Sequence, residues 1–226
     1  MKIRKRALWI ALALTMSLVL VFSCAKEKEP YRVGAVFSVT GRTSFLGEPE
    51  KKTADMIAEA INKVGGINGH PLELIIYDDE SDETKCVLAV KRLIKKDQVP
   101  VIIGPSLSGN TLAVVKVVND AKIPLVSCAA SNKIVQPVEK RKWVFKVPQS
   151  DTHAVEKIYE FMKGKGITKV AIMSVSTGFG ASGREELLRL APKMGMSILA
   201  DERYGPKDTD LTAQLTRIRG TGAQAI

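Results

Sequence analysis

VPVIIGPSLSGNTLAVVKVVNDAKIPLVSCAAS, residues 99–131, is the stretch that decides the fold of this chain. Residues 99–103 are β-branched and uncharged, which is typical of a strand buried on both faces of a parallel sheet. A hydroxyl-rich loop follows at residues 104–111, and apolar residues at helical spacing then predict a helix that closes at Lys122. Residues 123–126 predict the next buried strand. This order of strand, helix and strand predicts an α/β fold with a mostly parallel sheet.

Two small polar loops, residues 104–111 and 127–132, follow the carboxyl ends of these two strands. In an open parallel sheet, ligands bind outside the carboxyl ends of the strands, beside the N-termini of helices. Hydroxyls and free backbone N–H groups suit a small anion such as a carboxylate. Each loop alone could be an ordinary turn, because Ser, Gly and Asn are common turn residues. The pairing of the loops at one strand–helix–strand spacing favours a binding site.

The same stretch resembles a known family. Gly104-Pro105 followed by Ser108 and Thr111, and then the loop SCAAS at residues 127–131, are similar to the ligand loops of the branched-chain amino-acid (Leu/Ile/Val) binding proteins. Those proteins are extracytoplasmic solute-binding receptors of ABC importers. AINKVGGING at residues 60–69, followed by LELIIYDD at residues 72–79, is the most specific match. The resemblance spans nearly all of residues 31–226 and implies a two-lobed periplasmic-binding-protein type I fold, hinged about a crevice.

Length and composition indicate a globular protein. The chain has 226 residues, of which 45% are hydrophobic and 26% are charged. Its net charge is +10, but four of the basic residues lie in the first six positions. Without them the charge is about +6 and the lysines are scattered, so nucleic acid is not an expected partner.

The N-terminus predicts export. Residues 1–23 combine a basic start with an apolar run, which is typical of a signal peptide. A single transmembrane anchor is the alternative, but the run is short for a span. Cys24 follows Ser23 as at a lipoprotein cleavage site, so we expect a lipidated Cys24, a tether at residues 24–30 and a membrane-anchored protein in the periplasm or on the outer cell surface. A plain secreted protein is the other alternative.

Two further cysteines and two adjacent carboxylates allow more than one interpretation. Cys86 and Cys128 could pair, but Cys86 is in helical phase with Val90, which favours a buried core thiol. Asp78 and Asp79 could be metal ligands. Because no His or Cys lies nearby at ligand spacing, we expect them only to solvate the end of a strand, and we expect no metal site.

The chain divides into two predicted lobes. Residues 31–148 form the N-terminal α/β lobe, and residues 149–226 form part of a second one. Asp151 is expected to cap a helix that buries Val155, Ile158, Phe161 and Met162. Because residues 224–226 resemble the start of another strand, the sequence predicts a fragment with an incomplete second lobe.

The resemblance also implies the ligand contacts. Ser108 and Ser131 would bond the ligand carboxylate, and the carbonyl of Ala129 would accept from its ammonium. Phe179 would cap the site from the second lobe, and Leu46 stands where relatives often have a tyrosine. The residues expected to bind the ligand are Leu46, Ser106, Ser108, Thr111, Ala129, Ala130, Ser131 and Phe179.

These features favour a binding protein over an enzyme. No G-x-S-x-G elbow is present, and no phosphate-loop spacing follows Gly34, so we expect neither catalytic residues nor a cofactor. His70 and His153 lie in a turn and in a helical first turn. We therefore expect the substrate-binding component of an ABC importer for a small apolar amino acid, or for a related carboxylate or amide. A receptor of the same fold that is not coupled to transport is the alternative, and a hydrolase is less favoured.

Overall fold

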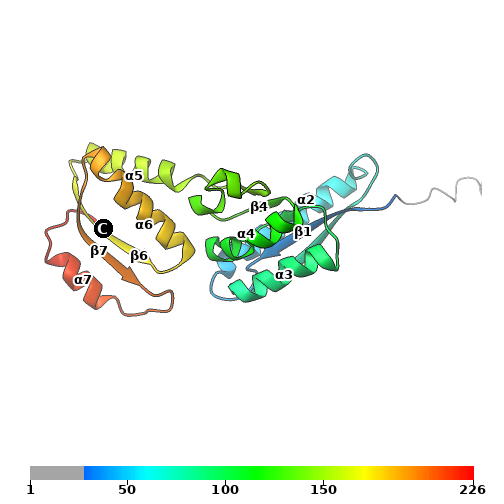
Figure 1. Cartoon of the computed structure of the whole chain (residues 1–226), viewed down its shortest axis with the longest axis horizontal. Helices are drawn as coiled ribbons and strands as arrows, with labels where there is room; N and C mark the ends of the chain where they lie inside the picture. Colours follow the sequence, from blue (N-terminus) through cyan, green and yellow to red (C-terminus); the bar gives the residue numbers. More distant parts are fainter. Residues whose placement is uncertain (1–27) are drawn as a thin grey trace, which may run out of the picture.

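The computed structural model describes residues 28–226. The expected signal peptide (residues 1–23), Cys24 and most of the tether (24–30) lie outside the described residues. The described chain builds two separate sheets, which lie in the two halves of an elongated molecule (Figure 1). This arrangement agrees with the predicted two-lobed α/β fold.

The first sheet is parallel throughout, with strand order β2-β1-β3-β4-β5. Right-handed crossovers place α3 and α4, which pack on each other, on one face of the sheet and α2 on the other. The elements are β1 (Tyr31–Phe37), α2 (Ser44–Lys63), β2 (Leu72–Asp78), α3 (Glu83–Lys95), β3 (Ile102–Ile103), α4 (Ser108–Ala121), β4 (Leu125–Ser127), the 3-10 turns η1 (Asn132–Ile134) and η2 (Val138–Lys140), and β5 (Val144–Lys146).

The core of the first lobe lies between its sheet and the α3–α4 layer. Cys86 is fully buried there beside Val90, so the prediction of a core thiol is confirmed. Burial raises the pKa of the Cys86 thiol and keeps it neutral. The central members of this core are Val36, Val90, Leu93, Ile102, Val114, Val118 and Leu125.

The second sheet pairs β6 (Lys169–Val175) with β7 (Ser197–Tyr204) in parallel. The accompanying helices are α5 (Asp151–Gly164), α6 (Gly178–Leu190), the 3-10 turn η3 (Pro192–Met194) and α7 (Thr212–Arg219). Ala225 forms a parallel bridge with Val170 on β6, as the strand-like pattern of residues 224–226 predicts.

Two expectations about the stretch at residues 99–131 are wrong in detail. The predicted strand at 99–103 is reduced to β3, because Pro100 has no N–H to donate to the sheet. The second half of the predicted hydroxyl-rich loop is helical, since α4 begins at Ser108. Thr111 supports this first turn, because both its amide and its hydroxyl donate to the carbonyl of Leu107.

The start and the packing of α5 also differ from expectation. Ser150, not Asp151, caps the helix by accepting from the amide of His153. Ile158 and Phe161 are exposed, and Tyr159 is buried in their place. Tyr159 and its neighbours one helical turn away pack toward β6. Phe161 therefore lies on the solvent side of α5.

Within residues 28–226, no helix is both long enough and apolar enough to cross a membrane.

Candidate functional site

A crevice of about 670 Å³ lies between the two lobes. Its walls come from the loops and helix starts at the carboxyl ends of the strands, which is where parallel sheets bind ligands. The first lobe contributes Arg42, Thr43, Phe45, Leu46, Glu83, Ser106, Leu107, Ser108, Gly109, Asn110, Cys128, Ala129 and Ala130, and the second contributes Val175, Ser176, Thr177, Phe179 and Pro206.

Two helix N-termini meet at this crevice. The first turn of α4 contributes Ser108, and the first turn of α6 contributes Phe179. Thr177 caps α6 by accepting from the amide of Gly180 at 3.3 Å. The unpaired N–H groups and the dipole at each helix start give the crevice a partial positive charge, which favours an anionic ligand.

The Ser108 hydroxyl can donate a hydrogen bond to a ligand. Ser108 is buried, and its Oγ accepts from the backbone N–H of Ser131 at 3.3 Å. That bond uses a lone pair of the oxygen and leaves the hydroxyl proton free. Ser106 differs, because its Oγ accepts from the amide of Ser38 and donates to the carboxylate of Glu50. Within the described crevice, Ser108 is therefore the better ligand donor of the two.

Six of the eight predicted site residues line the crevice, and two do not. Thr111 is fully buried behind it, with its Oγ1 2.8 Å from the Oγ of Ser127. The Oγ of Ser131 accepts from the amide of Lys133 and caps η1, so that hydroxyl is directed to the backbone. Ser131 reaches the site through its own N–H, which bonds to Ser108. The six lining residues are Leu46, Ser106, Ser108, Ala129, Ala130 and Phe179.

A buried carboxylate, Asp79, forms hydrogen bonds beneath the crevice that its sequence context does not predict. Asp79 is fully buried, so the expectation that it only solvates a strand end is wrong. It accepts from the Ser38 hydroxyl at 2.6 Å, from the Asn110 amide at 2.7 Å and from the Ser81 backbone at 3.0 Å. The carboxylate thus joins the ends of β1 and β2 to the first turn of α4, which carries Ser108.

Two titratable groups beside the crevice are shifted toward their neutral forms. Partial burial raises the pKa of the Glu50 carboxyl, the Ser106 hydrogen bond opposes this, and the nearby charge of Asp79 adds to the rise. Burial, together with the charge of Glu50, raises the pKa of the Cys128 thiol to about 12. Cys128 is therefore a neutral, weakly reactive thiol at the edge of the site.

Direct hydrogen bonds also join the two lobes. Asp151 is buried at the start of α5, and its Oδ2 accepts from the backbone N–H of Asn132 at 2.9 Å and from the Ser182 hydroxyl at 2.5 Å. Asn132 belongs to the first lobe and Ser182 to α6, so one carboxylate joins both lobes. A second bond between the lobes runs from Arg42 to the carbonyl of Pro206 at 3.5 Å, and both residues line the crevice.

Lys146 holds the second ligand loop to the segment that enters the second lobe. Its ammonium donates to the carbonyls of Ala130 at 2.6 Å and Gln149 at 2.8 Å. Burial lowers the pKa of Lys146, and the charge of Asp151 opposes that change. The only sequence signal for Lys146 is its place just before the predicted boundary between the lobes at residues 148 and 149.

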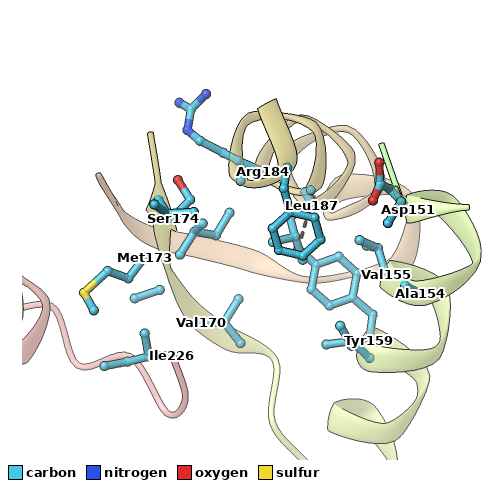
Figure 2. A pocket seen from close by; sticks show the side chains of 18 of the residues that line it. Asp151, Ala154, Val155, Tyr159, Val170, Met173, Ser174, Arg184, Leu187 and Ile226 are labelled. Atoms are coloured by element: carbon cyan, nitrogen blue, oxygen red, sulfur yellow. Dashed lines mark hydrogen bonds between the residues drawn. The ribbon is translucent and has the colours of Figure 1, made fainter. Parts of the chain in front are cut away.

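A second cavity of about 430 Å³ lies within the second lobe (Figure 2). Its walls are mainly aliphatic and aromatic side chains of α5, β6 and α6, with Phe179 shared between the two cavities. The hydroxyl of Tyr159 donates to the carbonyl of Leu187 at 2.9 Å, whereas the buried hydroxyl of Ser174 has no partner among the described residues. The Arg184 guanidinium points away from the cavity and bonds to Asp201.

In the part of the chain that the structure describes, no group of three or more His, Cys, Asp or Glu side chains could hold a metal ion.

Comparison with known proteins agrees with this geometry. A family model described as "Periplasmic binding protein" matches residues 30–226. An "Amino acid binding protein" from Pseudomonas aeruginosa is 26% identical over 199 residues, which is 86% of this chain and 52% of that protein.

Two solved structures are similar over the same region. An extracellular ligand-binding receptor from Rhodopseudomonas palustris HaA2 has a TM-score of 0.78 and 31% identity, with 86% of this chain and 52% of that chain covered. The substrate-binding protein of a branched-chain amino acid transporter from Streptococcus pneumoniae, solved with isoleucine, has a TM-score of 0.74 and 25% identity. There the match covers 85% of this chain and 54% of the other. The chain thus spans about half the length of the relatives it matches.

Proposed function

The chain belongs to the family of periplasmic binding proteins, and we propose that it is a ligand-binding receptor of the branched-chain amino-acid type that serves an ABC importer. Its ligand is a small apolar amino acid or a closely related carboxylate, bound in the crevice between the lobes. Binding selects the closed arrangement, because the ligand contacts both lobes at once. Neither catalysis nor a cofactor is part of this proposal.

The observation that carries the proposal is that two helix N-termini meet beside the Ser108 hydroxyl, whose proton no other described residue accepts. Ser108 has a proton to donate, and the unpaired N–H groups at the start of α4 add further donors. A carboxylate placed there would receive charge-assisted hydrogen bonds. Ala129 lines the same crevice, and its carbonyl would provide an acceptor for an ammonium group.

The remaining wall favours an apolar ligand side chain. Phe45 and Leu46 from the first lobe and Phe179 from the second are large apolar residues with exposed side chains that line the crevice. Covering them with a ligand would remove apolar surface from water, which contributes about 25 cal/mol per Å².

Three related compounds test which parts of the ligand are needed. L-isoleucine carries carboxylate and ammonium, L-isoleucinamide lacks the carboxylate, and 3-methylpentanoate lacks the ammonium. Calorimetry with each should give tightest binding for L-isoleucine and a large loss for the amide. Equal binding of the amide would contradict carboxylate recognition, and equal binding of 3-methylpentanoate would make the protein a receptor for simple acids.

Ser108→Ala tests the proposed donor directly. Because the hydroxyl would bond a charged group, its removal should weaken L-isoleucine binding by about 10- to 150-fold. Ser197→Ala, at an exposed position on β7, is the matched control and should leave the affinity unchanged. An unchanged affinity in a folded Ser108→Ala protein would remove Ser108 from the site.

Export and anchoring complete the proposal. The basic start, the apolar run and the Ser23-Cys24 pair support a signal peptide and a lipid anchor at Cys24. Mass spectrometry of the mature N-terminus should find an acylated Cys24, and an unmodified N-terminus at another position would exclude the anchor. Stimulation of ATP hydrolysis by a reconstituted permease would distinguish transport from sensing.

A further inference from the structure

Two glycines from opposite lobes meet at the crevice. Gly109 lies in the first turn of α4, and Gly178 is the first residue of α6. A methyl group added at Gly178 would lie 3.0 Å from the backbone nitrogen of Gly109 and 3.1 Å from its Cα. Ordinary van der Waals contact begins at 3.4 Å, so a methyl group at Gly178 would fit only if the backbone at the start of α4 gave way by a few tenths of an ångström.

This contact adjoins the two residues that the proposed function places at opposite ends of the ligand. Gly109 directly follows Ser108, and Gly178 directly precedes Phe179. The added methyl group would also lie 3.3 Å from the carbonyl carbon of Ser108. The atoms in the way are backbone atoms of a helix start, which cannot rotate aside as a side chain can.

We propose that Gly178 is a positioning residue for ligand binding: its missing side chain lets α6 approach α4 closely enough to bring Phe179 over a ligand held at Ser108. The proposal rests on the proposed function and adds the residue that sets the width of the crevice. Gly178 itself touches no ligand in this scheme and acts through Phe179.

Other contacts keep α6 in this place. The Ser182 hydroxyl, one helical turn after Gly178, donates to Asp151, and Arg42 reaches Pro206 across the rim. The close approach of the two helix starts is therefore supported by separate bonds on two sides. A substituent at Gly178 would act against all of them.

The same helix contains a matched control. Gly183 is also in α6, but a methyl group added there would meet no heavy atom within 4 Å. Both substitutions replace a glycine of α6 with alanine, which has the higher helix propensity. Gly178→Ala and Gly183→Ala therefore differ mainly in whether the new methyl group meets the other lobe.

The first test uses L-isoleucine as the probe and calorimetry as the readout. Gly178→Ala should weaken binding by about tenfold, and Gly183→Ala should not change it. In a Phe179→Ala background, Gly178→Ala should change the affinity by less than about twofold, because Phe179 is the group it positions. Full additivity of the two substitutions, or equal losses at 178 and 183, would overturn the proposal.

The second test needs no ligand and so separates this inference from the proposed function. Spin labels are placed at Lys116→Cys on α4 and Lys163→Cys on α5, both exposed positions, in a Cys24→Ser background. Cys86 and Cys128 react slowly, since burial raises both thiol pKa values.

The distance between the labels should lengthen in Gly178→Leu and stay unchanged in Gly183→Leu. Gly178→Ala gives a smaller shift in the same direction and serves if the leucine variant does not fold. An unchanged distance in the folded Gly178 variants would overturn the inference. If the spacing responds but L-isoleucine does not bind the unsubstituted protein, the failure lies in the proposed ligand and not in the glycine contact.

Discussion

The crevice between the lobes and the cavity within the second lobe are both hollows lined by Phe179, yet their polar groups are organised differently. Around the crevice, the hydroxyls of Ser106 and Ser108 are held by hydrogen bonds, and Asp79 braces the helix start beneath them. In the cavity, the buried Ser174 hydroxyl has no partner in the described chain. Volume alone does not make a binding site. Polar groups become recognition elements where the fold has already fixed their direction.

The largest difference should appear on removal of Asp79. Asp79→Ala leaves two buried donors, Ser38 and Asn110, without their acceptor, so the free energy of unfolding should fall by about 2–5 kcal/mol. Asp78→Ala is the control: Asp78 is partly exposed and bonds to Thr40, so about 1 kcal/mol is expected. Urea denaturation measures both free energies of unfolding. Equal losses would show that the buried hydrogen bonds of Asp79 contribute no more to stability than the partly exposed ones of Asp78.

The next effect concerns affinity. Phe179→Ala should weaken L-isoleucine binding by roughly 5- to 30-fold, which corresponds to about 1–2 kcal/mol of lost apolar contact. Phe161→Ala removes a phenylalanine of similar exposure from the solvent side of α5 and should leave binding unchanged. Calorimetry separates the two. If Phe161→Ala costs as much affinity as Phe179→Ala, the assignment of Phe179 to the crevice is wrong.

A smaller effect of opposite sign is expected inside the second cavity. Ser174→Ala removes a buried hydroxyl without a partner and should raise the free energy of unfolding by about 1 kcal/mol. Tyr159→Phe removes the donor to the Leu187 carbonyl and should lower it by about the same amount. Neither should change L-isoleucine affinity. A loss of affinity in Ser174→Ala would mean that this cavity takes part in binding.

The smallest effect is a pH dependence beside the crevice. The folded state raises the pKa of Glu50 above its ordinary value of 4.5. The contribution of Glu50 to stability is therefore complete below pH 4.5 and is lost as the pH rises through the pKa of the folded state. Glu50→Gln should therefore gain stability relative to the unsubstituted protein as the pH rises.

Glu48 on the same helix provides the control with the opposite sign. A hydrogen bond from Lys52 lowers its pKa, so its contribution is present above 4.5 and is lost as the pH falls. Unfolding curves of Glu50→Gln and Glu48→Gln across pH 3–7 should diverge in opposite directions from the unsubstituted protein. Parallel curves would contradict the assigned shifts.

The general fold could be predicted from sequence because its signals are local. Uncharged β-branched runs predict buried parallel strands, and Asp residues are favoured helix caps, as Asp82 of α3 shows by accepting from the amide of Lys85. The first residue of a helix is harder to predict from sequence. Hydroxyl and glycine residues are common both in loops and in first turns, so the start of α4 at Ser108 does not follow from composition.

The site was only partly predictable for a different reason. Nothing local distinguishes Asp79, which is buried, from its neighbour Asp78, which is not, since burial of Asp79 depends on partners 41 and 31 positions away in the chain. The family resemblance likewise implies that the Ser131 side chain binds the ligand, but this side chain caps η1 instead. Its position directly before a short turn was the available signal.

The bonds of Asp151 have a consequence for any attempt to dissect this protein. The carboxylate is completed from both sides, by Asn132 of the first lobe and Ser182 of the second. A cut at the lobe junction would leave Asn132 without its acceptor on one piece and a buried charge short of donors on the other. We therefore expect the two lobes to unfold together, although each has its own sheet and core.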